Sequence, residues 1–488
     1  MKFIKSHLWV ILLTLVIILP VFAHLTDVPV ELWDESRLAN NAFEMLQTGN
    51  LWVTTYDYRP DMWNTKPPLM IWLMSISMKV FGTGELGIRM PSALAAICTF
   101  FLVFWFTNKT SANKRTAFIA AFVLVTTGGY VKLHGTRTGD YDALLAFFTT
   151  AYIFMYFLYL QTDKGKYLLW FFIYIAGAIL TKGIAGFFFL PALFIYTLIQ
   201  RRLKNIFISH YFYIGLGVFL ILTVGYYLLR EHYNPGYIAA VMENEIGGRF
   251  GTVIEGHSGG PMFYVTLLST AHFTFWIMLF SLGIVIGVLS ADKAMQNLTI
   301  YLSLVVVVFY LVLSASESKL YWYDLPVFPI MAVITSIGVS YIISYVSMHS
   351  LAGKKTRVIA YAAILIFIFC LPYYSIIDFV LSPHTGLDEN SSMALYMKSV
   401  REGKRKIDGY LFTNDSKTDQ NINYYLKIHP TKLPYKDVND LIPSDKVIIF
   451  SPSIKEHINK NYDFEIVESI GDVKVCQIIK IKSQVSTL

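Results

Sequence analysis

An acidic pair followed by an arginine stands near the beginning of the chain, in the segment Leu32-Trp33-Asp34-Glu35-Ser36-Arg37. The segment Lys66-Pro67-Pro68-Leu69 follows it. A carboxylate can accept the proton of an attacking hydroxyl, and a lysine or arginine can stabilise a departing phosphate. Asp34 is our first choice for such a base and Glu35 the alternative, while Arg37 and Lys66 are the nearest cations. These groups suit the transfer of a substituent from a lipid phosphate.

The composition of the chain is that of a polytopic α-helical membrane protein. Of its 488 residues, 55% are hydrophobic and 15% are charged, and apolar runs recur at the length that crosses a bilayer as a helix. The first run also fits a cleavable signal peptide, but we favour an uncleaved helix. We expect about eleven spans, near residues 6–24, 91–107, 116–133, 142–160, 167–181, 183–200, 206–230, 262–289, 298–314, 322–346 and 357–381.

Basic residues gather in alternate connections between these spans, which the positive-inside rule assigns to the cytoplasm. The amino terminus is then inside and the carboxy terminus outside. The formal net charge of +7 follows from this topology, so we expect membrane lipids and no nucleic acid as partners. The basic connections contain Lys2 and Lys5; Lys109, Lys114 and Arg115; Lys164 and Lys166; Arg201, Arg202 and Lys204; Lys293; and Lys354, Lys355 and Arg357.

The opposite, outer connections collect ionisable side chains of both signs. Such groups are costly near hydrocarbon unless they are paired or face a wet cavity, so we expect a polar site on this face. The basic residues are candidates for binding a phosphate, and the aspartates and the histidine for orienting an acceptor or holding a divalent ion. Beyond the first loop, the candidates are Arg137, Asp140, Asp142, Lys182, Arg249, His257 and Lys319, accompanied by Glu243, Glu245, Glu255 and Glu317.

Each of these candidates also has a structural interpretation. The aspartates could cap the helices that follow them, and Arg137 and Lys319 could be interfacial residues at helix ends. His257 has no second metal ligand at close spacing, which favours a hydrogen-bonded loop residue. The three cysteines show no metal-ligand spacing. We therefore expect no obligatory cofactor, while a divalent cation is compatible with the acidic residues.

The first outer loop, residues 25–90, is long enough to contain helices of its own. Apolar residues recur at helical spacing over Glu35–Gln47, which predicts an amphipathic helix along the membrane surface. Pro68 is well placed to open a second helix that ends about Phe81. This helix is apolar nearly all round, so we expect it to be half sunk in lipid and to form a wall of a cleft for a lipid tail.

Several of these segments, in their order along the chain, resemble the bacterial protein mannosyltransferase and aminoarabinose transferase group of GT-C glycosyltransferases. Three departures stand out, because some relatives have an acid at Thr65 and the family has prolines at Ile184 and Tyr321. The first departure argues against a metal site that uses an acid there. The resemblance covers most of residues 8–345 and is carried by Asp34-Glu35-Ser36-Arg37, Gly49-Asn50, Lys66-Pro67-Pro68-Leu69, Phe81-Gly82, Arg89-Met90-Pro91-Ser92-Ala93-Leu94, Thr181-Lys182-Gly183, Arg249-Phe250 and Ser318-Lys319-Leu320.

The resemblance implies a GT-C fold in a bacterial inner membrane and a polyprenyl-phosphate sugar as donor. It also implies transfer with inversion at the anomeric carbon, with the first acid of the loop, Asp34, as base. The acceptor stays open between lipid A, another envelope glycan and a protein side chain. Trp322-Tyr323-Asp324 is similar to the Trp-Trp-Asp signature of oligosaccharyltransferases, but it begins a span and we assign it no function.

After residue 382 the hydrophobic runs shorten and lysines multiply. We therefore divide the chain into a membrane part, residues 1–382, and an outer α/β domain, residues 383–488, whose role in covering the cleft or contacting the acceptor is a hypothesis. Its expected elements are strands at Tyr410–Thr413, Val447–Ser451, Phe464–Ile470 and Val473–Ile481, a hairpin turn at Gly471-Asp472, and helices at Ser391–Arg401 and Asp419–Lys427.

Two other classes of function suit a polytopic chain. A secondary transporter or a flippase for lipid-linked sugars would also have many helices and a polar cavity. Transporters, however, place their ionisable residues near the bilayer midplane on broken helices, whereas here these residues lie in loops and at span ends. A non-catalytic assembly protein of the envelope would not need Asp34, Lys66 and the other charges together. The sequence favours glycosyl transfer.

Overall fold

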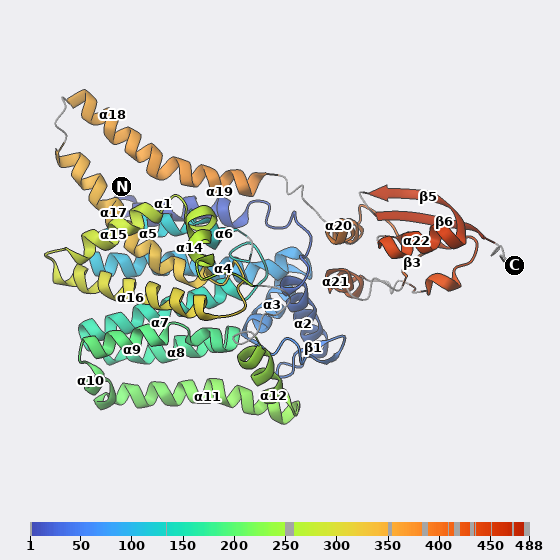
Figure 1. Cartoon of the computed structure of the whole chain (residues 1–488), viewed down its shortest axis with the longest axis horizontal. Coiled ribbons are helices and arrows are strands. Elements are labelled where there is room, and N and C mark those ends of the chain that lie inside the picture. Colours follow the sequence, from blue (N-terminus) through green and yellow to red (C-terminus); the bar gives the residue numbers. More distant parts are fainter. Residues whose placement is uncertain are drawn as a thin grey trace.

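The computed structural model describes residues 2–132, 134–248, 258–349, 354–382, 389–407, 409–413, 420–429, 434, 436–449, 451–470 and 473–482. Long helices run side by side through the larger part of the molecule, and a small sheet unit lies beyond one end of them (Figure 1). The helical elements are α1 (Lys2–Phe22), α2 (Asp34–Thr48), α3 (Leu69–Phe81), α4 (Glu85–Ser111), α5 (Lys114–Val125), α6 (Gly128–Val131), α7 (Asp142–Thr162), α8 (Gly165–Lys182), η1 (Gly183–Phe187), α9 (Leu190–Ile199), α10 (Leu203–Ile208), α11 (His210–Tyr233), α12 (Tyr237–Val241), η2 (Met242–Gly248), α14 (Phe263–Leu267), η3 (Leu268–His272), α15 (Ile277–Val288), α16 (Lys293–Ala315), η4 (Leu325–Val327), α17 (Phe328–His349), α18 (Lys354–Leu365), η5 (Ile366–Cys370) and α19 (Leu371–Leu381).

Seven helices among the described residues are long and apolar enough to cross a membrane. An eighth span results if Phe263–His272 and Ile277–Val288 count as one broken helix; the chain bends by 110° between them. The polytopic helical class is thereby confirmed, while the expected number of eleven is not. The seven are Glu85–Ser111, Asp142–Thr162, Gly165–Phe187, His210–Tyr233, Lys293–Ala315, Leu325–Ser347 and Tyr361–Leu381.

Two of the expected spans form shorter helices, each for a local reason. The span expected at 116–133 stops at Val125, where the hydroxyl groups of Thr126 and Thr127 donate to the carbonyl groups of the preceding helical turn. The span expected at 183–200 starts late, because Gly183 has a left-handed φ of +53° that ends α8 before α9 begins. The first expected span forms α1, whose 21 residues, Lys2–Phe22, include the apolar stretch His7–Phe22.

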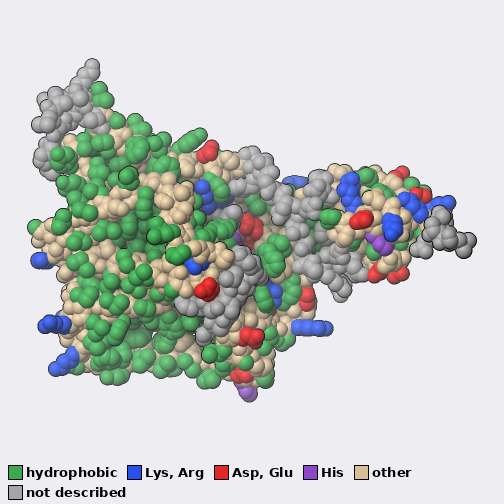
Figure 2. Space-filling view, in the orientation of Figure 1, with side chains coloured by type: hydrophobic (Ala, Val, Ile, Leu, Met, Phe, Trp, Pro, Cys, Tyr) green, Lys and Arg blue, Asp and Glu red, His purple; other side chains and the backbone are tan. Residues whose placement is uncertain are grey.

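The surface of the helical body is predominantly hydrophobic (Figure 2). On the outermost helix, α11, Ile221 is 74% exposed and Leu228 is 60% exposed. Lysine and arginine side chains project from the end of the bundle that lies away from α2. A hydrophobic belt with charged residues beyond it is the surface expected of a chain embedded in lipid.

The first outer loop contains the two helices that its sequence predicts. α2 begins at Asp34 and ends at Thr48, and Gly49 directly after it adopts the left-handed conformation that glycine tolerates. α3 begins directly after Pro68 and packs against both α2 and α4. It buries Met70 and Met74, and it leaves Ile76 and other apolar side chains of its far side exposed. These helices bring residues 34–81 over the end of the bundle.

A buried ion pair fixes the first outer loop to α4. The Arg89 Nε and Nη2 atoms donate to the two Glu35 carboxylate oxygens over 2.7 and 2.8 Å, and the remaining N–H groups of Arg89 donate to carbonyls of residues 25–29. Glu35 also accepts the backbone N–H groups of Gly139 and Glu31. Because every charge here has partners, the pair can remain buried, and it joins the first and second outer loops.

The carboxy-terminal unit has a four-stranded sheet in the order β3-β4-β6-β5. β3 (Tyr410–Leu411) and β4 (Lys446–Ile449) are parallel, whereas β4 with β6 (Val473–Ile481) and β6 with β5 (Tyr462–Ile470) are antiparallel. α20 (Glu389–Arg401) and α21 (Gln420–Ile428) lie on the side of the sheet that faces α2 (Figure 1). The expected strands and helices are present, α22 (Pro452–Asn461) was not expected, and the expected turn at Gly471-Asp472 lies outside the described residues.

Replacement of Arg89 by methionine should strongly destabilise the protein, because it leaves the Glu35 carboxylate buried without its cation. Breaking one partner of a buried pair costs about 3–5 kcal/mol. Arg89→Met should therefore lower the unfolding temperature of the purified protein in detergent. Arg59→Met, a matched change at an exposed arginine, should leave it unchanged. Equal unfolding temperatures for both variants would show that the pair does not stabilise the fold.

Candidate active site

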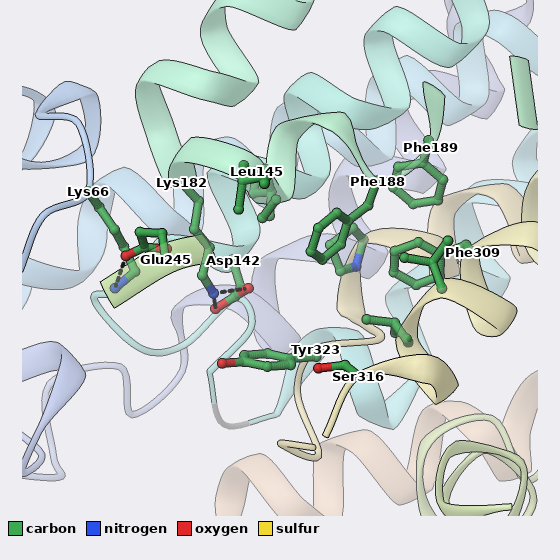
Figure 3. Close-up of a pocket in the computed structure, with 15 residues that line it drawn as sticks. Lys66, Asp142, Leu145, Lys182, Phe188, Phe189, Glu245, Phe309, Ser316 and Tyr323 are labelled. Carbon is green, nitrogen blue, oxygen red and sulfur yellow. Dashed lines mark hydrogen bonds and ion pairs between the residues drawn. The ribbon is translucent and has the colours of Figure 1, made fainter. Parts of the chain in front are cut away.

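A cavity of about 300 Å³ opens between α7, η1 and α16. Lys66, Glu245, Asp142 and Lys182 gather on one side of it, while aromatic rings such as Phe188 line the other side (Figure 3). The aliphatic and aromatic lining of the second side consists of Leu145, Ile184, Ala185, Phe188, Phe189, Phe309, Val312 and Leu313. A ligand with a charged head and a hydrocarbon tail fits this division of polarity.

Each of the two lysines in the cavity is held by a carboxylate. The Lys182 Nζ donates to both Asp142 carboxylate oxygens over 2.6 and 2.7 Å, and it lies 5.5 Å from the centre of the Tyr323 ring. The Lys66 Nζ lies 3.8 Å from the Glu245 Oε1. Lys66 and Lys182 are both buried. Their pairing with carboxylates keeps the two cations charged and in place while leaving them beside the cavity.

A second, mostly apolar cavity of about 350 Å³ lies on the other side of Lys66. Its lining includes Phe187, Phe219 and Tyr227, and it shares Lys66, Ile184 and Glu245 with the first cavity. The pair of Lys66 and Glu245 therefore stands between two spaces that can each accommodate hydrocarbon.

Asp34, His134 and Asp140 form a cluster, in which one ligand atom of each residue lies within 4.8 Å of those of the other two. The His134 Nδ1 is 2.9 Å from the Asp140 Oδ2, and the imidazole stacks on the Trp322 ring with centroids 3.7 Å apart. Imidazole nitrogen and carboxylate oxygen are ligands that divalent metal ions accept in proteins. Among the residues that the structure describes, these three are therefore the group that could hold a cation.

The pKa values of the His134–Asp140 pair shift in the directions that favour its charged form. Burial acts against both charges, but for His134 the hydrogen bond and the charge of Asp140 outweigh burial and raise the imidazole pKa. For Asp140, the hydrogen bond from His134 and the charges of Lys182 and His134 outweigh burial and lower the carboxyl pKa. The three residues of the cluster do not line the first cavity themselves, but Asp142 and Tyr323, which are close in sequence to Asp140 and to the stacked Trp322, do.

Three of the residues predicted from the sequence have structural roles instead. Glu35 is buried against Arg89 and does not line the cavity. The Arg37 Nη2 lies 2.6 Å from the Asp61 Oδ1; burial alone would raise the pKa of Asp61, but the hydrogen bond and charge of Arg37 lower it overall. The predictions that Glu35 serves as a base and Arg37 as a phosphate ligand thus receive no support from the geometry.

Arg137 is the third of these residues. Its guanidinium donates to the backbone carbonyl groups of Pro20 and Ala23, at the end of α1. Those carbonyl groups have no partner within the helix, so the arginine completes the helix end. Arg137 therefore fixes α1 to the second outer loop and does not line the cavity.

The other predicted cations lie at the edge of the site or beyond the described structure. The Lys319 Nζ donates to the backbone carbonyl of Ser316, a residue that lines the first cavity. Lys319 is thus at the rim rather than in the cavity. Arg249 and His257 lie outside the described residues.

The sequence analysis missed His134, Glu245 and Tyr323 as site residues. His134 could have been found from its position six residues before Asp140 in the same connection, and Glu245 was noted only as one of several acids of the fourth loop. Our expectation for Trp322-Tyr323-Asp324 is corrected, because Trp322 stacks on His134 and Tyr323 lines the cavity. These contacts form where distant loops meet, so no pattern of neighbouring residues predicts them.

Comparison with known proteins adds independent evidence. The model of the family described as dolichyl-phosphate-mannose-protein mannosyltransferase matches residues 65–227. The undecaprenyl phosphate-alpha-4-amino-4-deoxy-L-arabinose arabinosyl transferase of Shewanella sediminis is 27% identical over 63% of this chain and 56% of its own length. A protein of Aquifex aeolicus is 24% identical over 62% of this chain and 58% of its own length. The matched region thus spans less than two thirds of these relatives.

Solved structures show the same fold. The structure of ArnT from Cupriavidus metallidurans bound to undecaprenyl phosphate matches with a TM-score of 0.74 and 16% identity, over 97% of this chain and 98% of that one. The Archaeoglobus fulgidus oligosaccharyltransferase matches with a TM-score of 0.61 and 13% identity, over 87% of this chain and 64% of that one. The chain therefore shares the fold of these two structures, and its residues 65–227 are similar to the protein mannosyltransferase family.

Proposed function

We propose that this chain transfers a sugar from a polyprenyl-phosphate donor to an acceptor hydroxyl at the extracytoplasmic face of the bacterial inner membrane. The observation that carries the proposal is the presence of two buried lysines, each paired with a carboxylate, on one side of a cavity whose other side is apolar. In this orientation the amino terminus is cytoplasmic, and the carboxy-terminal unit lies outside. The basic end of the bundle, away from α2, supports this orientation through the positive-inside rule (Figure 2).

The donor would bind with its phosphate at Lys66 and Lys182 and with its prenyl chain along the side that contains Phe188. Lysine is a common point charge for phosphate binding. The phosphate would replace Glu245 and Asp142 as the partner of the two lysines, so the cations are prepared before the donor arrives. The related ArnT was solved with undecaprenyl phosphate, which supports a donor of this class.

In the reaction, Asp34 would accept the proton of the acceptor hydroxyl as its oxygen attacks the anomeric carbon. The bond between that carbon and the phosphate oxygen then breaks, and polyprenyl phosphate leaves as an anion stabilised by the two lysines. Attack on the face opposite the leaving phosphate inverts the anomeric configuration. The proximity of Asp34 to His134 and Asp140, within 4.8 Å, and the position of Asp142 in the cavity lining support this role.

The second cavity favours an acceptor with a hydrocarbon tail. It lies across Lys66 from the first cavity and is lined mainly by apolar side chains. A lipid acceptor such as lipid A could place its tail there and its hydroxyl near the donor head. This observation supports modification of a lipid over modification of a protein side chain.

A divalent cation would fit between Asp34, His134 and Asp140. Such an ion would orient the acceptor and stabilise its developing negative charge. A carboxylate has two oxygens, so Asp34 can ligate an ion with one oxygen and accept a proton with the other. Asp142 is paired separately with Lys182, so it would hold this lysine in place until the donor phosphate binds.

Lys66→Met should weaken the binding of undecaprenyl phosphate by about tenfold to a hundredfold, the effect of losing one charge-assisted contact. The Kd can be measured by fluorescence titration of the purified protein in detergent. Glu245→Gln should instead tighten binding, because it removes the carboxylate that competes with the phosphate. Lys132→Met, at a partly buried lysine beside a different cavity, is the matched control. Unchanged affinity in both site variants would contradict the phosphate role.

Asp34→Asn should reduce turnover by at least about a hundredfold, because it removes the base and keeps the shape of the side chain. Turnover is measured as undecaprenyl phosphate released from an undecaprenyl-phosphate sugar in the presence of envelope lipids. Binding of undecaprenyl phosphate should not change. Asp27→Asn, at an exposed aspartate of the same loop, should retain full turnover. Wild-type turnover in Asp34→Asn would exclude Asp34 as the base.

Dialysis against EDTA should lower turnover, and added Mn²⁺ or Zn²⁺ should restore it. After dialysis against either ion, elemental analysis should find metal bound to the wild-type protein and much less bound to Asp140→Asn, since one of three ligands is lost. Glu231→Gln, at a carboxylate far from the cluster in sequence, is the control. Equal metal content in wild type and Asp140→Asn, with turnover insensitive to EDTA, would remove the cation from the mechanism.

A further inference from the structure

The amino-terminal part of α21 holds the backbone on both sides of Asp34. The Val30 N–H donates to the Tyr425 hydroxyl over 2.9 Å, and the Asn421 side-chain amide donates to the Val30 carbonyl over 3.4 Å. On the other side of Asp34, the Asn40 side-chain amide donates to the Gln420 carbonyl over 2.9 Å. The backbone hydrogen bonds that the described structure gives Val30 therefore both come from the carboxy-terminal unit.

Tyr425 also connects this contact to the beginning of α4. Its hydroxyl donates to the Glu85 Oε1 over 2.5 Å, and the Arg401 Nη2 of α20 lies 2.5 Å from the Glu85 Oε2. Tyr425 is only 2% exposed, and Glu85 is buried as well. This buried hydroxyl both accepts and donates, so removing it leaves the Val30 N–H without its partner and Glu85 with one partner fewer.

The backbone held in this way would not keep its conformation by itself. Residues 29–31 belong to neither a helix nor a strand. Trp33, directly before Asp34, has a φ of +71°, a conformation that costs a bulky residue about 1–3 kcal/mol and persists only where its surroundings impose it. External contacts are therefore needed to fix the point at which α2 begins.

A second attachment holds the far part of α2. The Lys427 Nζ lies 2.6 Å from the Glu44 Oε1 and 2.8 Å from the Asp57 Oδ1. Glu44 in turn accepts the backbone N–H groups of Asp57 and Tyr58. α21 therefore contacts the first outer loop before and after Asp34. A tilt of α2 would break at least one of these contacts.

We infer that the carboxy-terminal unit positions Asp34 for the proposed transfer, with Tyr425 and Asn421 as positioning residues that act through Val30. This inference rests on the proposed function. Neither residue lines either cavity beside Lys66, so the unit acts on the base and not on the bound donor. Its role thus differs from the covering of the cleft that the sequence suggested.

The test compares Tyr425→Phe with Tyr462→Phe in the full-length protein. Tyr462 belongs to the same unit, and its buried hydroxyl donates to the Val438 carbonyl over 2.8 Å, within the small core under the sheet. Hydrogen–deuterium exchange of residues 28–37 reports on the backbone around Asp34. Turnover and undecaprenyl phosphate affinity are measured as above, and size-exclusion chromatography verifies the fold.

Tyr425→Phe should speed exchange at residues 28–37 and reduce turnover, each by roughly tenfold, because a small displacement of a catalytic group is costly. The affinity for undecaprenyl phosphate should stay at the wild-type value, and Tyr462→Phe should change none of the three. Asn421→Ala should act in the same direction and replaces Tyr425→Phe if that variant does not fold.

Wild-type exchange and turnover in the folded α21 variant would overturn the inference, as would an equal effect of Tyr462→Phe. A loss of donor affinity in parallel with turnover would also overturn it, because the unit would then act on binding. If the wild-type protein transfers no sugar, the proposed function fails, while the exchange measurement still decides whether α21 holds the loop. The two failures are therefore distinguishable.

Discussion

A charge that leaves water must be paired, and this constraint organises the whole structure. Arg89 and Glu35 form the central pair, which joins α4 and both of the first two outer loops. Other pairs, such as Arg37 with Asp61 and Lys427 with Glu44, extend this network outward. The network fixes loops that contain little regular structure and whose backbone would otherwise lack partners. Asp34 has a defined position because the residues around it are held in this way.

The ion pairs differ in whether a ligand can reach them. This difference separates the pairs that only stabilise the fold from those that can bind a substrate. Glu35 and Arg89 use all their hydrogen-bonding groups inside the protein, so neither has capacity left for a substrate. Lys66 and Lys182 are also paired, but they stand beside open volume. An incoming phosphate can therefore reach these two cations from the open volume. The proposed mechanism uses this access together with the acidic cluster around Asp34.

Local features of the sequence predicted much of the helical fold and the general place of the site. Pro68 stands directly before α3 and Gly49 directly after α2, so these two helix bounds depend on neighbouring residues. Most spans follow from hydropathy. The choice of ion-pair partners could not be predicted, because it depends on which distant segments meet. Arg137 binds the end of α1 across more than a hundred residues of sequence, and Tyr425 binds Val30 across 395 residues. Charge alone made Arg137 and Lys182 equivalent candidates, and only the fold distinguishes them.

The central claim is sugar transfer, and mass spectrometry of the cell envelope tests it most directly. Lipids, glycans and proteins would be compared between cells with the wild-type chain, with Asp34→Asn and without any copy. The account predicts that one envelope molecule lacks a sugar-sized mass in both defective strains, which would identify the sugar and the acceptor together. An envelope that lacks no sugar, with polyprenyl-linked or other solutes redistributed across the membrane, would contradict the account and indicate transport.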